Sequence, residues 1–376
     1  MRKQGKSPDF GAQRQFAAGY QVLREAIRAR AFPGCAFGVL AGGEVALHDA
    51  LGQFTYEKDA DEVMPETVFD VASLTKVVAT TAAAMLLVQR RQLDLETPLG
   101  ELLPGFWDGR AQEDAVRRVR LRHLLAHSSG LPGYVEFFRN ASTPAALLEA
   151  CERLPLKAEP ATHAEYSDPG FILLGKALEA KMGDRLDGWT RREVFEPLGM
   201  GNTGFCPPVA VRSTIPPTEN DTAFRDRVIQ GEVQDENAYV LEGVAGHAGL
   251  FSNVADLLRF AKAILQDGMG NDDKGEPHLF DRETVEKFAR RQDPKGSTRA
   301  LGWDTPSENS SAGRHFGAHS IGHLGYSGCS LWVDLDAEVA IALLTNRTWP
   351  DRQCQMIREV RPAFHNAIRE AMENAN

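Results

Sequence analysis

The stretch VASLTKVVATTAAAMLL, residues 71–87, decides the fold and raises the main question of the sequence. Its valines, leucines and alanines predict a buried helix over residues 74–92, in the middle of a layer. Lys76 stands in the first turn of this helix, where the apolar run begins. Lysine is rarely buried unless its charge is paired. Lys76 therefore either reaches solvent along its aliphatic stem or has its ammonium group inside for a purpose.

Ser73 precedes Lys76 by three residues, so both side chains share one helix face, about 5–6 Å apart at Cβ. Free N–H groups and the helix dipole at this end favour a developing negative charge. A serine hydroxyl is a weak nucleophile until a base takes its proton, which a partly desolvated lysine with a lowered pKa can do. The spacing thus indicates a nucleophile beside its proton acceptor. The alternative is a helix-capping serine followed by a lysine that extends to solvent.

The sequence outside this helix predicts an antiparallel sheet made from both ends of the chain. Residues 12–31 carry an apolar stripe typical of a helix, and residues 35–52 form two strand patterns around a Gly-Gly turn, as in a β-hairpin. Two β-rich runs, Ser330–Asp334 and Glu338–Thr345, are separated by an Asp-Ala turn, and Arg358–Met372 predicts a closing helix.

Between these ends, strand patterns nearly vanish, and Pro, Gly and helical patterns alternate. We therefore expect an α+β fold. Residues 1–96 and 245–376 would form an antiparallel β-sheet flanked by helices, and residues 97–244 an inserted, mostly helical domain. A length of 376 residues fits one large domain or two interlocked ones.

The composition excludes several classes of function. The net charge of −10 argues against nucleic acid as a partner. The five cysteines are scattered and form no CxxC motif, so we expect neither a disulfide framework nor a zinc site, and no cofactor. The N-terminal residues lack the apolar stretch of a secretory signal, and the apolar run Val77–Val88 is too short to span a bilayer. We therefore expect no membrane span and a cytoplasmic location; a periplasmic location would require a leader outside this sequence.

Two further stretches carry side chains suited to chemistry. In EYSDPGFILLG, residues 165–175, Tyr166 precedes a predicted helix for which Asp168 suits the cap and Pro169 the first turn. In GHLGYSG, residues 322–328, glycines around His323 permit close approach of a ligand, and histidine titrates near neutral pH. Taken singly, these residues are as consistent with a buried, hydrogen-bonded tyrosine, a capping aspartate and a surface histidine.

In chain order the three features read Ser73-Leu-Thr-Lys76, Tyr166-Ser-Asp168 and His323-Leu-Gly325. With this order the chain resembles the serine hydrolases of the β-lactamase and penicillin-binding protein superfamily, in particular class C β-lactamases, D,D-peptidases and family VIII-type esterases. The pattern of that superfamily is S-x-x-K, then Y-x-N or Y-S-x, then K-T-G or H-x-G. The resemblance covers about residues 15–365 and implies an active site in the cleft between the sheet domain and the inserted helical domain.

The resemblance also implies roles in an acyl-enzyme mechanism on a small ester, amide or peptide. Ser73 would be the acylated nucleophile, and Lys76 and Tyr166 would share the proton relay. Either the Lys76 ammonium holds Tyr166 near its phenolate form, or Tyr166 helps to keep Lys76 neutral. The two groups titrate as a unit, so the sequence leaves both possibilities open.

The backbone N–H groups of Ser73 and Tyr326 would form the oxyanion hole of such an enzyme. His323 would orient the substrate or assist proton transfer, and Asp168 and Gly325 would line the substrate site. All of these roles are implied by the resemblance.

Two residues depart from the commoner pattern. Asp168 replaces an asparagine, and a carboxylate only accepts hydrogen bonds, so it could pair with Lys76 and raise its pKa or repel an acidic substrate. His323 replaces a permanent cation. Both changes weaken a site for a β-lactam carboxylate, so we favour an esterase or D,D-peptidase-like activity. The alternatives are a β-lactamase, or a protein that binds penicillin or peptidoglycan fragments without turnover.

Other candidate sites carry weaker signals. His315, His319 and His323 recur every four residues, but the intervening glycines argue against a helix that could present them to a metal. Cys329 has no base at a recognisable spacing and is a poor candidate nucleophile. We therefore predict no metal site.

Overall fold

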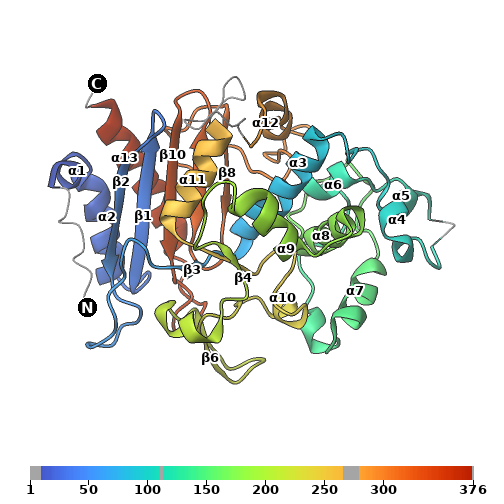
Figure 1. The fold of residues 1–376 in the computed structure, drawn as a ribbon, viewed down its shortest axis with the longest axis horizontal. Helices are drawn as coiled ribbons and strands as arrows, with labels where there is room; N and C mark the ends of the chain where they lie inside the picture. The colour runs from blue at the N-terminus through green and yellow to red at the C-terminus, as the bar shows by residue number, and fades with distance from the viewer. Residues whose placement is uncertain (1–9, 111–112, 266–278, 375–376) are drawn as a thin grey trace.

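The computed structural model describes residues 10–110, 113–265 and 279–374. Figure 1 shows a five-stranded sheet beside a group of helices. The strand order is β2–β1–β10–β9–β8, and every neighbouring pair is antiparallel. The strands come from both ends of the chain, as predicted: β1 Gly34–Ala41, β2 Glu44–Gly52, β8 Ser320–Leu324, β9 Ser330–Asp334 and β10 Val339–Thr345.

The local sequence explains most of this sheet. Gly42 and Gly43 both have positive φ, 54° and 80°, which is why a Gly-Gly pair turns β1 into β2. The predicted hairpin and the predicted strands β9 and β10 are confirmed, although β10 begins one residue later than expected, at Val339. The short edge strand β8, which carries His323, was not predicted as a strand.

Helices cover both faces of the sheet. Side chains alternate along β1, so that Phe37 and Val39 face one hydrophobic cluster with α2 and α13, whereas Ala36 and Leu40 face the larger cluster on the side of α11. The helices are α2 (Ala17–Arg28), α13 (Ile357–Glu373) and α11 (Val254–Leu265). The helix predicted over residues 12–31 is broken at Phe16, which separates α2 from α1 (Phe10–Gln15).

The central apolar stretch is helical but not uniform. It consists of a 3₁₀ turn η1 (Ala72–Leu74), a π-helical segment η2 (Lys76–Thr81) and the helix α3 (Ala82–Gln89). Residues 72–89 are long and apolar enough to cross a bilayer, but 83% of this stretch is buried inside the protein, as befits the central helix of a core. Local π-helical geometry is common at functional sites.

The middle of the chain is mostly helical but also contributes three short strands that were not predicted, β4 (Gly204–Phe205), β5 (Glu219–Asp221) and β6 (Arg227–Ile229). β5 pairs with β6, and β4 pairs with β7 (Leu250–Ser252). β7 pairs in turn with β3 (Phe69–Asp70), which lies in the stretch TVFDVAS, residues 67–73, where the sequence favours a short strand or an extended approach to the next helix. The division into domains at residues 96/97 and 244/245 stays a prediction.

The α-helices of the middle and later parts include α4 Leu99–Leu102, α5 Asp114–Arg117, α6 Leu121–Leu125, α7 Pro144–Glu152, α8 Asp168–Met182, α9 Leu186–Thr190, α10 Glu236–Val240 and α12 Arg282–Ala289. The same parts contain the 3₁₀ segments η3 Pro104–Phe106, η4 Phe137–Arg139 and η6 Val209–Thr214, and the π-helical segment η5 Arg191–Phe195.

A glycine contact joins α8 to the loop before β7. A Cβ on Gly175 of α8 would lie 2.9 Å from the Cα of Gly246, and a Cβ on Gly246 would lie 2.2 Å from the carbonyl oxygen of Phe171. The Thr80 hydroxyl also donates to the Gly246 carbonyl at 2.7 Å. The absence of side chains at these two glycines lets α8, η2 and this loop meet.

We expect Gly246→Ala to lower the thermal unfolding midpoint by several degrees, because the new methyl group meets backbone atoms that cannot move aside. Overpacking costs about 1–3 kcal/mol, and each kcal/mol corresponds to roughly 2–4 °C in domains of 150–250 residues. Gly201→Ala is the matched control, because a Cβ there meets nothing within 4 Å. Equal midpoints for the two variants, measured by circular dichroism, would contradict the packing argument.

Candidate active site

Ser73 lies in a turn whose backbone is strained. Ala72, directly before it, has a φ of 47°, in the left-handed region that alanine rarely adopts. The Ala72 N–H donates to Asp70 Oδ1 at 2.8 Å, and this bond holds the turn. The cap positions of η1 and η2 are Val71 and Thr75, and Ser73 lies inside η1, so the alternative of a capping serine is wrong. Strained turns of this kind are frequent at catalytic positions.

Lys76 is fully buried, so the alternative of a lysine extending to solvent is also wrong. Its Nζ donates to Ser73 Oγ at 3.0 Å, to Asp168 Oδ1 at 2.7 Å and to the His247 carbonyl at 3.0 Å. Three acceptors match the three hydrogens of an ammonium group. Burial disfavours this charge, but Asp168 and Tyr166 outweigh burial and raise the pKa of Lys76 above its ordinary value. Lys76 is therefore charged at neutral pH.

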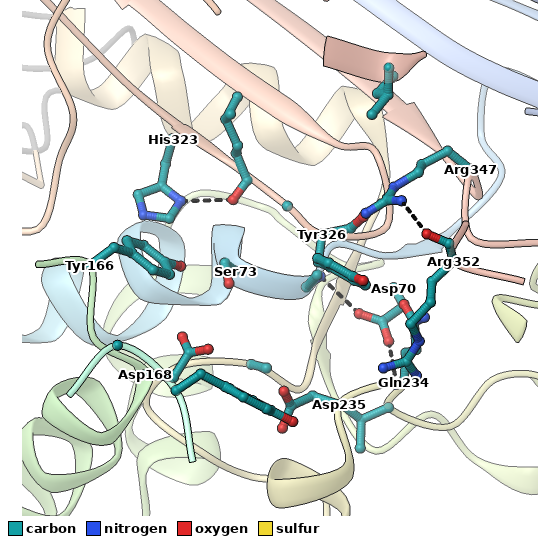
Figure 2. Close-up of a pocket in the computed structure, with 18 of the residues that line it drawn as sticks. Asp70, Ser73, Tyr166, Asp168, Gln234, Asp235, His323, Tyr326, Arg347 and Arg352 are labelled. Atoms are coloured by element: carbon teal, nitrogen blue, oxygen red, sulfur yellow. Dashed lines mark hydrogen bonds between the residues drawn. The ribbon is translucent and has the colours of Figure 1, made fainter. Parts of the chain in front are cut away.

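Tyr166 directs its hydroxyl towards Ser73 (Figure 2). The Nζ of Lys76 lies 4.8 Å from the centre of the tyrosine ring, and the His127 ring stacks against it at 4.6 Å. Burial raises the pKa of Tyr166, while the charge of Lys76 and hydrogen bonds with Lys76 and Ser73 lower it; burial dominates. The phenol is thus protonated in the resting site.

Asp168 does not cap α8, as one alternative for this residue supposed. The cap is Ser167, whose Oγ accepts from the Gly170 N–H at 3.0 Å. Asp168 is the first residue of the helix, and its carboxylate is free to pair with Lys76. The pairing that the sequence allowed for Asp168 is therefore the one observed.

His323 is buried at the end of β8, with 3% of its surface exposed, so it is not the surface histidine of the alternative interpretation. Its Nδ1 lies 2.9 Å from the Leu324 carbonyl oxygen, which can only accept, so Nδ1 carries the hydrogen. Nε2 is buried and has no hydrogen-bond partner among the described residues. Burial, followed by the charges of Lys76 and Arg299, holds the pKa of His323 well below its ordinary value. The imidazole is neutral and presents a lone pair.

Gly325 allows the turn after β8 to approach the nucleophile. A Cβ at Gly325 would lie 2.4 Å from the carbonyl oxygen of Val71. The next residue, Tyr326, is half exposed, and its ring lies 4.4 Å from the Arg347 guanidinium. Within the described residues, neither the Tyr326 N–H nor the Ser73 N–H donates a hydrogen bond to a protein acceptor. Both donors of the predicted oxyanion hole are thus available.

These residues line one cavity of about 720 Å³. The predicted residues Ser73, Tyr166, Asp168, His323, Gly325 and Tyr326 are all in its wall. The wall also includes charged residues of both signs: Asp70, Glu136, Asp235, Glu236, Asp304, Arg299, Arg347, Arg352, Arg358 and Arg361.

Sequence reasoning missed two residues that hold Lys76 and its neighbours. His247 contributes a main-chain carbonyl, which no side-chain pattern reveals. Its Nε2 lies 2.9 Å from Asp235 Oδ1. Burial alone would raise the pKa of Asp235, but His247 and the N–H of Ala238 outweigh burial and lower it to about 2. The carboxylate is therefore ionised. An aspartate directly before a short helix, where it serves as the N-cap, was a visible but unspecific signal.

The weaker candidates do not form a site. His315 contacts Glu370 and Glu373, and His319 contacts Asp336, so these two histidines do not converge with His323. Cys329 is fully buried, which raises the pKa of its thiol to about 11. A buried, protonated thiol is not a nucleophile.

Comparison with known proteins fits this geometry. The Beta-lactamase family matches residues 20–363 of the chain. The chain is 31% identical over 354 residues to the N-acetylmuramyl-L-alanine amidase of Bacillus subtilis, with 85% of this chain and 78% of the relative covered. It is 30% identical over 308 residues to a Salmonella typhi protein named "Putative D-alanyl-D-alanine carboxypeptidase", with 75% and 69% covered.

Among solved structures, the fold is similar to that of EstCE1, a hydrolase with promiscuous acyltransferase activity. The TM-score is 0.75 at 20% identity, with 95% of this chain and 100% of that chain covered. Because the family match spans nearly the whole chain and includes all three motifs, the protein belongs to the β-lactamase family and is a serine hydrolase that acts through an acyl-enzyme.

Proposed function

We propose that the protein hydrolyses a small ester or amide, as an esterase or a D,D-peptidase-like enzyme, with Ser73 as the nucleophile. The observation that carries this proposal is the 3.0 Å hydrogen bond between the buried Lys76 Nζ and Ser73 Oγ, at the wall of the cavity. The names of similar proteins support it, since one is a hydrolase with acyltransferase activity and another is named as a carboxypeptidase.

The protons of the resting site suggest how the serine is activated. Lys76 is an ammonium and Tyr166 a phenol, because both pKa values lie above their ordinary ones. Neither group can accept the Ser73 proton until the pair has lost one proton. We infer that the active form is this singly deprotonated pair, in which the tyrosine oxygen, held near the ammonium, takes the proton from Ser73 Oγ and later passes it to the leaving group.

The carbonyl oxygen of the substrate would then accept hydrogen bonds from the N–H groups of Ser73 and Tyr326 as its negative charge develops. On the other side of Tyr166, the neutral His323 offers a hydrogen-bond acceptor at Nε2, and the ring centres are 5.9 Å apart. Such an acceptor suits a leaving group or water that carries a hydrogen.

The charges near Ser73 support an ester or peptide over a β-lactam. His323 is neutral and Asp168 adds a carboxylate, so neither supplies the cation that would hold a carboxylate next to the reacting bond. Arginines such as Arg347 and Arg358 line the cavity elsewhere, which keeps a peptide with a free carboxylate among the candidate substrates.

Ser73→Ala is expected to abolish both ester hydrolysis and covalent labelling by a fluorophosphonate probe, because it removes the hydroxyl that lies beside Lys76 and would be acylated. Cys329→Ala is the comparison and should keep the label, since that thiol is buried and protonated. Labelling should be followed by mass spectrometry of the intact chain. A label that survives in Ser73→Ala would rule out this serine as the nucleophile.

A panel of a short-chain p-nitrophenyl ester, a D-alanyl-D-alanine peptide and nitrocefin should separate the activities. We expect turnover of the ester, the peptide or both to exceed that of nitrocefin at least tenfold, because the site lacks a cation at the third motif. The measurement is kcat/KM for each substrate. Fast nitrocefin hydrolysis without ester or peptide cleavage would instead indicate a β-lactamase, and a burst of one product per chain without a steady state would indicate a binding protein.

Asp168→Asn should shift the part of the pH–rate profile in which the rate rises with pH. Activity in the wild type should rise with pH into the alkaline range, because the Lys76–Tyr166 pair must lose a proton. Removing the Asp168 charge removes a stabiliser of the ammonium, so the midpoint should shift to lower pH by about one unit or more. The profile is measured as kcat/KM for the ester from pH 7 to above pH 11, with uncatalysed ester hydrolysis subtracted and unfolding midpoints recorded in parallel. A midpoint that stays in place or moves upward would contradict the assigned charge states.

A further inference from the structure

Asp70 is a buried carboxylate that the sequence analysis did not single out. It has 2% of its surface exposed, yet no cation among the described residues forms an ion pair with it. Instead, Oδ1 accepts the Ala72 N–H and Oδ2 accepts the Gln234 N–H, both at 2.8 Å. Figure 2 shows this carboxylate in the cavity wall beside Ser73. Both oxygens are thus committed to main-chain donors.

The backbone of Asp70 makes a second connection. Its carbonyl oxygen accepts the Ser327 hydroxyl at 2.8 Å. Ser327 follows Tyr326, and Ala72 precedes Ser73. Asp70 therefore holds Ala72 and Ser327. These two residues are next to Ser73 and Tyr326, whose N–H groups would form the oxyanion hole. Oxyanion donors are effective only within about 2.7–3.1 Å of that oxygen, so small shifts of either turn matter.

A third connection leads to Lys76. Gln234, which Asp70 holds through its N–H, is followed by Asp235. The Asp235 carboxylate contacts His247 Nε2 at 2.9 Å, and the His247 carbonyl accepts from Lys76 Nζ at 3.0 Å. The segment that Asp70 fixes is therefore the one that supports the ammonium group.

We propose that Asp70 is a positioning residue of the acylation step, which aligns the Ser73 and Tyr326 N–H groups through its carboxylate and its carbonyl. This inference rests on the proposed function, because it concerns the transition state of Ser73 acylation. Both carboxylate oxygens of Asp70 are occupied by main-chain donors, so its effect should fall on kcat and leave KM nearly unchanged.

The charge state of Asp70 provides a readout that a merely structural residue would lack. The carboxylate accepts strongly from both N–H groups, whereas a protonated acid accepts more weakly at its hydroxyl oxygen and brings an O–H that needs an acceptor of its own. Burial raises the pKa of Asp70 to about 6, against the N–H donors of Gln234 and Ala72; the nearby charged side chains are Asp235, which raises this pKa, and Arg225, which lowers it. The pKa values of Lys76 and Tyr166 lie above their ordinary values and that of His323 well below, so none of these falls near 6.

The sign of the effect on stability is opposite to that on activity. Because the pKa of Asp70 is higher in the folded protein than its ordinary value of 3.8, the folded state binds this proton more tightly than the unfolded state between about pH 4 and 6. The contribution of Asp70 to stability therefore increases as the pH falls through this range. Acid inactivation through Asp70 is expected without unfolding.

The test compares Asp70→Asn with Asp334→Asn, a buried aspartate that, unlike Asp70, also pairs with Arg369 at 3.2 Å. Asp334 is also buried, and its two oxygens also accept backbone N–H groups, at 3.2 and 3.1 Å, but it lies outside the cavity wall. We expect Asp70→Asn to lower kcat for the p-nitrophenyl ester by about 10- to 100-fold, less than the roughly 100- to 1000-fold for complete loss of an oxyanion donor, with KM within about twofold of wild type. Asp334→Asn should keep the wild-type kcat and pH profile.

The pH profile is the decisive readout. In the wild type, log(kcat/KM) should fall more steeply below about pH 6 than above it, while the folded fraction stays constant. In Asp70→Asn this extra fall should be absent. If that variant does not fold, Ser327→Ala removes the carbonyl connection alone, and it should lower kcat while keeping the fall near pH 6. A wild-type kcat in both variants, or an unchanged acid limb in Asp70→Asn, would overturn the inference.

The two proposals fail in different ways. Loss of labelling and activity in Ser73→Ala combined with a wild-type Asp70→Asn would remove only the role of Asp70. Retained labelling in Ser73→Ala would remove the proposed function itself, whatever Asp70→Asn does.

Discussion

The contact between Lys76 and Asp168 is the interaction on which the rest of the site depends. Burying an ammonium group costs several kcal/mol, which is offset here by a carboxylate at 2.7 Å and two further oxygen acceptors. Removing one partner of such a pair typically costs about 3–5 kcal/mol. The first turn of the central helix and the start of α8 therefore cannot separate without leaving a charge uncompensated. Tyr166, two residues before Asp168, is placed by the same contact.

Three titratable side chains of the site reach different charge states because their neighbours differ. Burial alone would neutralise lysine, histidine and tyrosine alike. Lys76 has a carboxylate next to it and remains an ammonium. His323 has only a main-chain carbonyl at Nδ1 and is neutral. Tyr166 is adjacent to a cation, but burial dominates and it keeps its proton. The reaction centre thus holds one cation, one acceptor and one donor from these three side chains.

The architecture and the catalytic candidates could be predicted because their signals are local: periodicity, a Gly-Gly turn and three ordered motifs. The parts that could not be predicted depend on long-range contacts. His247 acts through a carbonyl oxygen that every residue possesses, and Asp70 meets Gln234 from far away in the chain. The cap of α8 shows the limit of local rules, since Ser167 and Asp168 are equally good capping residues. In the structure Ser167 caps α8, and Asp168 instead pairs with Lys76.

The sheet order has a consequence for folding during synthesis on the ribosome. β1 pairs along its length with β10, so that Cys35 lies opposite Thr345, and the hydroxyl of Ser327 reaches back to Asp70. Such high contact order slows folding and delays the sheet until residues 320–345 have been made. A nascent chain that already carries Ser73, Lys76 and Tyr166 still lacks the second oxyanion donor, Tyr326. Hydrolytic activity should therefore emerge only after β8, β9 and β10 have been made, as a property of the completed sheet.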